Sequence, residues 1–140
     1  MTVYLDASVI VAYFVPEAWS AQATRYVAAH NGDLIVSSFA HGETMSAISR
    51  RRRMRQLSVD HAEMIAGNVD EWVSTTTVIG TAEPDIMEAI ALVRRFDFGL
   101  RMPDAIHAAT CARRGLTLVT FDTRLAYAAR MIGIDVTPPA

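Results

Sequence analysis

A short apolar segment that ends in an acidic residue opens this chain and constrains its fold most strongly. Residues 3–5 (Val-Tyr-Leu) predict a buried strand, and Asp6 follows them directly. An apolar run with helical spacing comes next, from Ser8 to about Phe14. In open α/β folds, ligands bind at the carboxyl ends of the strands, where the next helix begins. Asp6 is therefore a candidate site residue, and other carboxylates are expected to converge on it.

Strand and helix patterns alternate along the rest of the chain. Further strands are predicted at residues 34–36, 75–79, 116–121 and 134–137, with helices at 18–30, 39–53, 58–73, 83–96, 102–114 and 123–131. Such alternation predicts an α/β fold in which helices cover both faces of a parallel sheet. The helices at 39–53 and 58–73 are separated by a tight break, so they are expected to form an antiparallel hairpin.

The composition limits the class of protein. A chain of 140 residues and 15.4 kDa predicts one domain, residues 1–140. No apolar run approaches the ~18–20 residues of a membrane span, and Asp6 interrupts the N-terminal run, so neither a membrane segment nor a signal peptide is expected. The single Cys111 cannot form an internal disulfide, which fits a cytoplasmic location.

The charged residues have an unusual distribution. All 13 basic residues are arginine, and lysine is absent, which excludes any mechanism that needs a lysine. The net charge of -2 argues against nucleic-acid binding by bulk charge alone.

Four carboxylates stand out by their positions. Asp6 and Asp122 each follow a predicted strand, Asp104 lies in the first turn of an alanine-rich helix, and Glu43 lies one turn inside its helix. Each also has a purely structural interpretation. Asp122 suits a helix N-cap, Asp104 the helix dipole, and Asp6 a turn. Glu43 suits a surface ion pair with arginine.

Convergence of the four acids would require a cation. Two carboxylates ~5 Å apart repel each other by about 3 kcal/mol at an effective dielectric near 20, and the chain has no lysine to compensate. Oxygen ligands suit Mg²⁺ or Mn²⁺ rather than zinc or copper. One or two such ions activate water and stabilise a phosphoryl transition state, which predicts phosphodiester hydrolysis.

Four segments carry a resemblance to a known family. They are Y-L-D-A-S-V-I (4–10), S-S-F-A-H-G-E-T-M-S-A-I (37–48), P-D-A-I-H-A-A-T (103–110) and T-L-V-T-F-D-T-R-L (117–125). In order and spacing they resemble the PIN-domain family, and within it the VapC toxins of bacterial type II toxin–antitoxin systems. The resemblance covers essentially the whole chain, although the region of residues 50–57 matches more weakly.

The resemblance implies a PIN-like three-layer fold with a parallel five-stranded sheet. It also implies an Mg²⁺- or Mn²⁺-dependent endoribonuclease that cleaves RNA by two-metal-type hydrolysis. Asp6, Glu43, Asp104 and Asp122 match the family's catalytic, metal-binding acids, and Ser8 matches a hydroxyl residue that supports the first acid. Expected partners are RNA, a VapB-like antitoxin and a second copy in a homodimer, with no membrane.

Other residues leave alternatives open. The basic run of Arg50, Arg51, Arg52, Arg53 and Arg55 indicates either a solvated helix end or a surface that binds RNA or an acidic partner. His41 and His107 are weak candidates for metal ligands, since oxygen ligands already suffice. Trp19, Trp72 and Phe96 are interpreted as core or dimer-interface residues rather than base-stacking residues.

Three other functions compete with the nuclease. A PIN fold without catalysis would serve as an RNA- or antitoxin-binding module. A phosphoacceptor receiver-like domain also places aspartates at strand ends and binds Mg²⁺, but it carries paired N-terminal acids and a late lysine, which this chain lacks. Haloacid-dehalogenase-like phosphatases need a D-x-D motif, and residues 6–8 are Asp-Ala-Ser.

Overall fold

The computed structural model describes residues 2–138. The strands are β1 (Val3–Leu5), β2 (Leu34–Ser37), β3 (Thr77–Ile79), β4 (Thr117–Val119) and β5 (Val136–Thr137). The helices are α1 (Ala7–Phe14), α2 (Ser20–Ala29), α3 (Ser38–Arg53), α4 (Val59–Ser74), α5 (Glu83–Val93), the 3₁₀ turn η1 (Phe96–Phe98), α6 (Met102–Arg114) and α7 (Thr123–Met131).

The five strands form one parallel sheet in the order β3-β2-β1-β4-β5. In register, Val3 lies opposite Leu34 of β2 and Thr117 of β4. The predicted α/β fold with a five-stranded parallel sheet is confirmed. β1 is the central strand, and β4 is its neighbour, so the residues that follow these two strands meet at one edge of the sheet.

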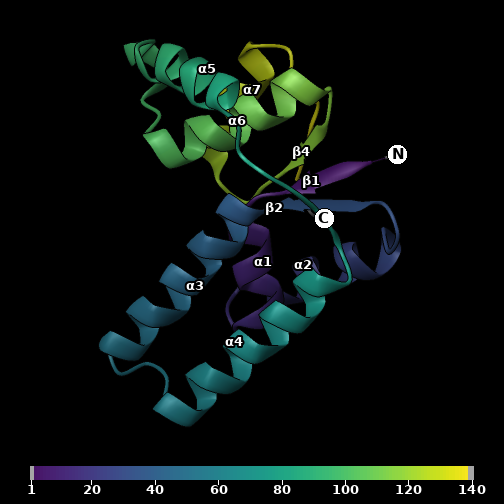
Figure 1. Cartoon of the computed structure of the whole chain (residues 1–140), viewed down its shortest axis with the longest axis vertical. Coiled ribbons are helices and arrows are strands. Elements are labelled where there is room, and N and C mark those ends of the chain that lie inside the picture. Colours follow the sequence, from purple (N-terminus) through teal and green to yellow (C-terminus); the bar gives the residue numbers. More distant parts are fainter. Residues whose placement is uncertain (1, 139–140) are drawn as a thin grey trace.

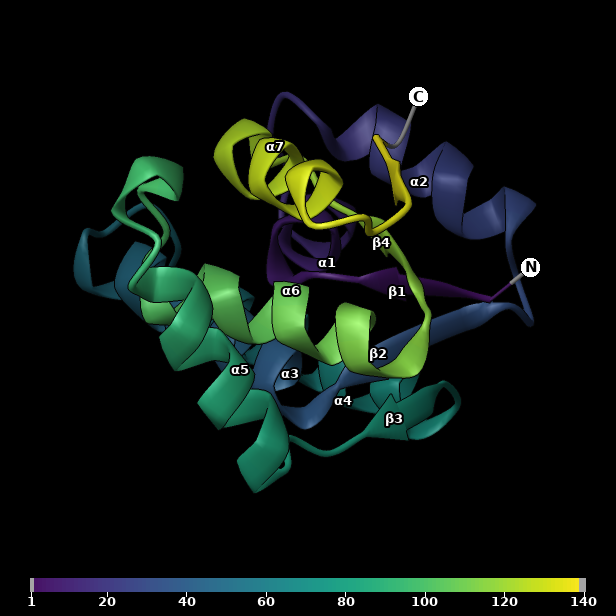
Figure 2. The same ribbon diagram turned by 90° about the horizontal axis from the view of Figure 1, so that it is seen from above.

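Helices cover both faces of the sheet, giving three layers (Figure 1). One face carries α5, α6 and α7, and the other carries α1 to α4. In the view from above, α6 lies across the middle of the sheet beside α5 and α7 (Figure 2). The side chains of β1 alternate between the layers: Tyr4 packs with α6 and α7, while Val3 and Leu5 pack with α1 and α2. All three are fully buried, which anchors the segment that ends in Asp6.

The expected helical hairpin is formed by α3 and α4, which run in opposite directions and pack together (Figure 1). Ser37 caps α3 through Ala40 N, and Ser58 caps α4 through His61 N. The hairpin packs on α1 through an apolar cluster that includes Ile48, Ile65 and Val69. Val59, the first residue of α4, is 54% exposed and lies outside the buried face of the helix.

Several predicted boundaries differ for local reasons. The hydroxyls of Thr75 and Thr76 donate to Trp72 O and prolong the end of α4, so β3 begins only at Thr77. The helix predicted to run to Phe96 ends at Val93, and η1 then turns the chain before Gly99, whose φ of 62° favours glycine.

A buried ion pair joins α5 to α6. Asp85 is 0% exposed, and its Oδ1 accepts hydrogen bonds from Arg113 at 2.6 Å and Arg114 at 2.8 Å. Its Oδ2 also accepts from Ala82 N, which caps α5. The Arg114 guanidinium outweighs burial and, with Ala82 N and Arg113, holds the pKa of Asp85 far below its usual range.

Within residues 2–138, no helix combines the length and the apolar character needed to cross a membrane.

Candidate functional site

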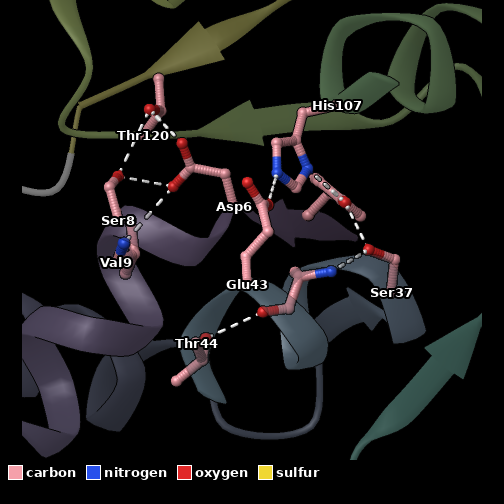
Figure 3. A network of polar contacts seen from close by, with 10 residues as sticks. Asp6, Ser8, Val9, Ser37, Glu43, Thr44, His107 and Thr120 are labelled. Carbon is pink, nitrogen blue, oxygen red and sulfur yellow. Dashed lines mark hydrogen bonds and ion pairs between the residues drawn. The ribbon is translucent and has the colours of Figure 1, made fainter. Parts of the chain in front are cut away.

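Asp6 lies at the junction of β1 and α1, as the sequence predicted. Its side chain is almost inaccessible, at 3% exposure. Oδ1 accepts hydrogen bonds from Ser8 Oγ at 2.6 Å and Val9 N at 3.3 Å, and Oδ2 accepts one from Thr120 Oγ1 at 2.5 Å (Figure 3). The carboxylate is therefore held in a fixed orientation by neutral groups alone.

The hydroxyls that hold Asp6 also join the ends of β1 and β4. Ser8 Oγ accepts a hydrogen bond from Phe121 N at 3.0 Å, and Thr120 Oγ1 accepts one from Asp122 N at 2.9 Å. Residues 120–122 are thus fixed beside Asp6. This geometry also explains why β4 ends at Val119 rather than at the predicted residue 121, since Thr120 turns out of the ladder toward the carboxylate.

Asp122 is the N-cap of α7, which is the structural role considered for it. Its Oδ1 accepts from Arg124 N at 2.9 Å and Leu125 N at 3.0 Å. It also lines a cleft of about 400 Å³ together with Ser8 and Glu43. Capping therefore fixes Asp122 at the same edge of the sheet as Asp6.

Glu43 is held by His107 rather than by a surface arginine. Glu43 Oε1 pairs with His107 Nε2, and His107 Nδ1 lies 2.7 Å from Tyr4 Oη (Figure 3). Tyr4 Oη in turn lies 2.7 Å from Ser37 Oγ, which accepts from Ala40 N. A buried polar chain thus runs from β1 and the start of α3 to Glu43.

Burial is the largest cause of the raised pKa values of two of the acids, Asp6 and Asp104. It raises the pKa of Asp6 above its usual value, although His107 and the hydrogen bonds from Ser8 and Thr120 oppose this. Burial also raises the pKa of Asp104, and the charge of Asp122, with smaller effects from Glu43 and Asp6, raises it further against the opposing effect of His107. Asp104 therefore lies within electrostatic reach of the other three predicted acids.

His107 is the cationic partner of this cluster. Its burial lowers its pKa, but the hydrogen bond to Glu43 and the charges of Asp6, Glu43 and Asp104 outweigh burial, and the net pKa is raised. One imidazole thus lies among three of the four carboxyl groups, so acidic groups outnumber basic ones in the cluster.

A hard divalent cation fits the chemistry of this donor set, because it consists of carboxylates with excess charge. Across residues 2–138, however, no three acidic, histidine or cysteine side chains are arranged so that they could hold a metal ion as they stand. Glu43 is turned to His107, and Asp122 Oδ1 is engaged as a cap. His41 pairs with Asp70 at 2.8 Å and so lies in a separate pair.

The arginine run ends α3 and begins the turn into α4. Arg51 pairs with Glu17 at 3.2 Å, and Arg53 donates to Ser49 Oγ at 2.7 Å. Arg50 and Arg51 line a second hollow, of about 460 Å³, on the side of α3.

Comparison with known proteins places this fold and site in context. The PIN domain family model matches residues 3–131. The chain belongs to the PIN domain family. The predicted family is therefore confirmed, and Asp6, Glu43, Asp104 and Asp122 all lie within the PIN domain match. A search of curated proteins finds no match.

Solved structures with the same fold include toxin–antitoxin proteins. VapC20 from Mycobacterium tuberculosis, described as a sarcin-ricin loop cleaving toxin, superposes with a TM-score of 0.76 at 19% identity, covering 91% of this chain and 95% of that one. FitAcB from Neisseria gonorrhoeae gives 0.77 at 16%, covering 99% and 98%. DNA-bound VapBC from Salmonella typhimurium gives 0.74 at 15%, covering 100% of both chains. This PIN domain thus shares the fold of VapC toxins.

Sequence reasoning missed the support that surrounds these acids. Tyr4 was interpreted only as part of an apolar strand, and Thr120 only as part of a strand, although each carries a hydroxyl that now lies against the site. The signal available was a polar atom in an otherwise apolar strand, because such an atom must find a partner when it is buried.

We predict that Tyr4→Phe lowers the free energy of unfolding by about 1–2 kcal/mol, because the buried His107 Nδ1 and Ser37 Oγ then lose their shared partner. Urea denaturation measures this difference. Tyr127→Phe removes the same hydroxyl from an exposed ring and serves as the matched control. Equal stability of the two variants would contradict a structural role for the polar chain.

Proposed function

We propose that this PIN domain is a metal-dependent endoribonuclease and acts as the toxin of a type II toxin–antitoxin pair. One observation carries the proposal: Asp6 is buried and held by hydrogen bonds at the end of the central strand, with Asp104 within electrostatic reach and with Glu43 and Asp122 lining the cleft at Ser8. Membership of the PIN domain family and the fold shared with VapC toxins support it.

In this proposal Asp6, Asp104 and Asp122 hold Mg²⁺ or Mn²⁺, and Glu43 completes the site or orients the attacking water. A bound ion supplies a water of lowered pKa and neutralises charge on the scissile phosphate. Ser8 and Thr120 fix the direction of the Asp6 oxygens. Glu43 pairs with His107, so its carboxylate must turn away from His107 if it is to ligate the ion directly. In-line hydrolysis would leave a 5′-phosphate and a 3′-hydroxyl.

The proposed partners follow from the same likeness. They are an RNA substrate, a VapB-like antitoxin and a second copy of the chain in a homodimer, in the cytoplasm. Arg50, Arg51, Arg52, Arg53 and Arg55 are proposed to bind RNA phosphates or the partner. A catalytically silent PIN module that binds RNA or an antitoxin is the second candidate, because the acids of residues 2–138 are not prearranged around an ion.

Incubation of the purified protein with total RNA separates the two candidates. We expect cleavage in Mg²⁺ or Mn²⁺, loss of cleavage on chelation, and fragments whose new 5′ ends carry phosphate. The 5′ ends are mapped by ligation-dependent sequencing. Cleavage that persists in chelator, or fragments with 2′,3′-cyclic ends, would contradict the metal-dependent mechanism, whereas RNA binding without cleavage would favour the silent module.

A further inference from the structure

Trp19, in the loop between α1 and α2, and Phe121, between β4 and α7, form a stacked aromatic pair beside the carboxylates. Trp19 is 50% exposed, and its indole stacks on the ring of Phe121, with centroids 5.0 Å apart and planes 25° apart. Trp19 and Phe96, which is 85% exposed, were expected in the core or in a dimer interface, and their exposure excludes the core alternative. Trp72, in contrast, does pack among Tyr13 and Phe14. One face of the Trp19 ring is thus stacked on Phe121, while half of the residue's surface stays exposed.

The aromatic pair is fixed relative to the acids. Phe121 directly precedes Asp122, and its backbone N–H donates to Ser8 Oγ, which itself donates to Asp6. Trp19 and Phe121 both line the 400 Å³ cleft, together with Ser8, Glu43 and Asp122. One wall of this cleft is therefore aromatic and another is acidic.

Basic residues continue from the cleft along one side of α3. Ala47 lies four residues after Glu43, and Arg50 and Arg51 lie seven and eight residues after it, so all four share one helix face. Ala47 lines both the acidic cleft and the hollow that contains Arg50 and Arg51, so the two hollows adjoin. The arginines lie about 11 Å from Glu43 along the helix axis, at a rise of about 1.5 Å per residue.

The aromatic pair and the arginines suit the bases and the phosphates of a single-stranded nucleic acid. Proteins bind unpaired strands by stacking bases on aromatic rings and by pairing phosphates with arginine. The aromatic pair at the acidic cleft and the arginines of the adjoining hollow together favour a single-stranded RNA as occupant.

We propose that Trp19, backed by Phe121, stacks an unpaired base of a single-stranded RNA next to the phosphate at the carboxylates. The following phosphates lie along α3 at Arg50 and Arg51. Stacking at this position favours looped or unpaired RNA over duplex, whose bases are not free to stack. The inference rests on the proposed function, since it takes the carboxylates as the place of the scissile phosphate.

Trp19 provides its own spectroscopic probe. The chain has two tryptophans, so Trp72→Phe leaves Trp19 as the only one. In this background, Trp19 fluorescence is titrated with a single-stranded RNA oligonucleotide in Ca²⁺, a hard cation that also takes oxygen ligands. A second titration uses the same oligonucleotide with abasic sites in place of the bases. We expect strong quenching by the first and little by the second.

Affinities of variants then separate stacking from charge. Measured by filter binding in the otherwise native chain, Trp19→Leu is expected to weaken binding of the base-bearing RNA about 5- to 150-fold, from stacking worth about 1–3 kcal/mol per base. The abasic strand should lose little, and Trp19→Phe should keep most of the affinity. Arg50→Ala should weaken binding to both strands and flatten the salt dependence. Thermal unfolding checks that each variant folds.

Three results would overturn the stacking inference: equal binding of base-bearing RNA by wild type and Trp19→Leu, equal losses on both strands, or quenching by an arginine-containing peptide but not by RNA. The proposed function can fail independently of the stacking inference. If RNA quenches Trp19 fluorescence but is not cut in Mg²⁺, the stacking site stands and the nuclease function is refuted. If RNA is cut and Trp19→Leu leaves the KM unchanged, the nuclease function stands and the stacking site is refuted.

Discussion

Replacement of Asp6 by asparagine is expected to reduce RNA cleavage by about 10³-fold while making the metal-free protein more stable. The loss of activity follows from the proposed role of Asp6, because removal of one charged ligand forfeits several kcal/mol of stabilisation at the scissile phosphate. Asparagine keeps the size and one acceptor oxygen of the side chain, so the local fold should persist.

The gain in stability has a separate cause. Burial raises the pKa of Asp6, which means that its charged form is disfavoured in the folded state. A raised carboxyl pKa contributes stability below the unfolded value near 3.8 and loses it as the pH rises through the folded value. At pH 7 the neutral amide avoids this penalty, so we expect a higher Tm than that of the wild type in chelator.

Three measurements test this prediction together: cleavage rate in Mg²⁺, Tm in chelator and Tm in Mg²⁺. Wild type should be stabilised by Mg²⁺, and Asp6→Asn should not. Asp135→Asn, at an exposed position just before β5, is the matched control and should change none of the three. A folded Asp6→Asn protein that cuts RNA at the wild-type rate would sink the assignment of Asp6, and a lower Tm in chelator would refute the electrostatic argument.

The sequence predicted those features of the fold and the candidate site that depend on local pattern. The strand of residues 3–5 ends at Asp6 because the apolar run ends there, and α3 and α4 form the expected hairpin because the break between them is short. The parallel order of β1 and β4 brings Asp6 and Asp122 to the same edge, as expected for alternating strands and helices.

Partners far apart in the chain could not be predicted in this way. His107 joins Tyr4, 103 residues away, to Glu43, 64 residues away, and no periodicity encodes such a chain of contacts. The exposure of Trp19 was missed for a related reason. A lone tryptophan is compatible with a core or a surface until its neighbours are known, and Phe121 lies about a hundred residues further along the chain.

Asp85 shows how a buried carboxylate behaves when its partners are charged. Asp6 and Asp85 are both buried, yet burial raises the pKa of Asp6, whereas the arginines on Asp85 lower its pKa. Hydroxyls and one imidazole face Asp6, while two guanidiniums face Asp85. The fold thus compensates the charge of Asp85, which has a structural role, with two guanidiniums. It compensates the charge of Asp6, at the proposed site, less completely.

Asp85→Asn is accordingly expected to destabilise the protein. The variant leaves Arg113 and Arg114 without their counter-charge and weakens the link between α5 and α6. We expect a loss of about 2–3 kcal/mol, at the low end for a buried pair because both guanidiniums are partly exposed. Urea denaturation at pH 7 measures it, and Glu88→Gln, on the exposed side of the same helix, is the control.

The pH dependence of that loss identifies its cause. A lowered carboxyl pKa contributes stability above the unfolded value near 3.8, and the contribution disappears as the pH falls toward the folded value. The stability difference between wild type and Asp85→Asn should therefore be full at pH 7 and shrink as the pH falls below about 4. A difference that stays constant between pH 7 and pH 3 would show that packing, rather than the charge of Asp85, holds α5 against α6.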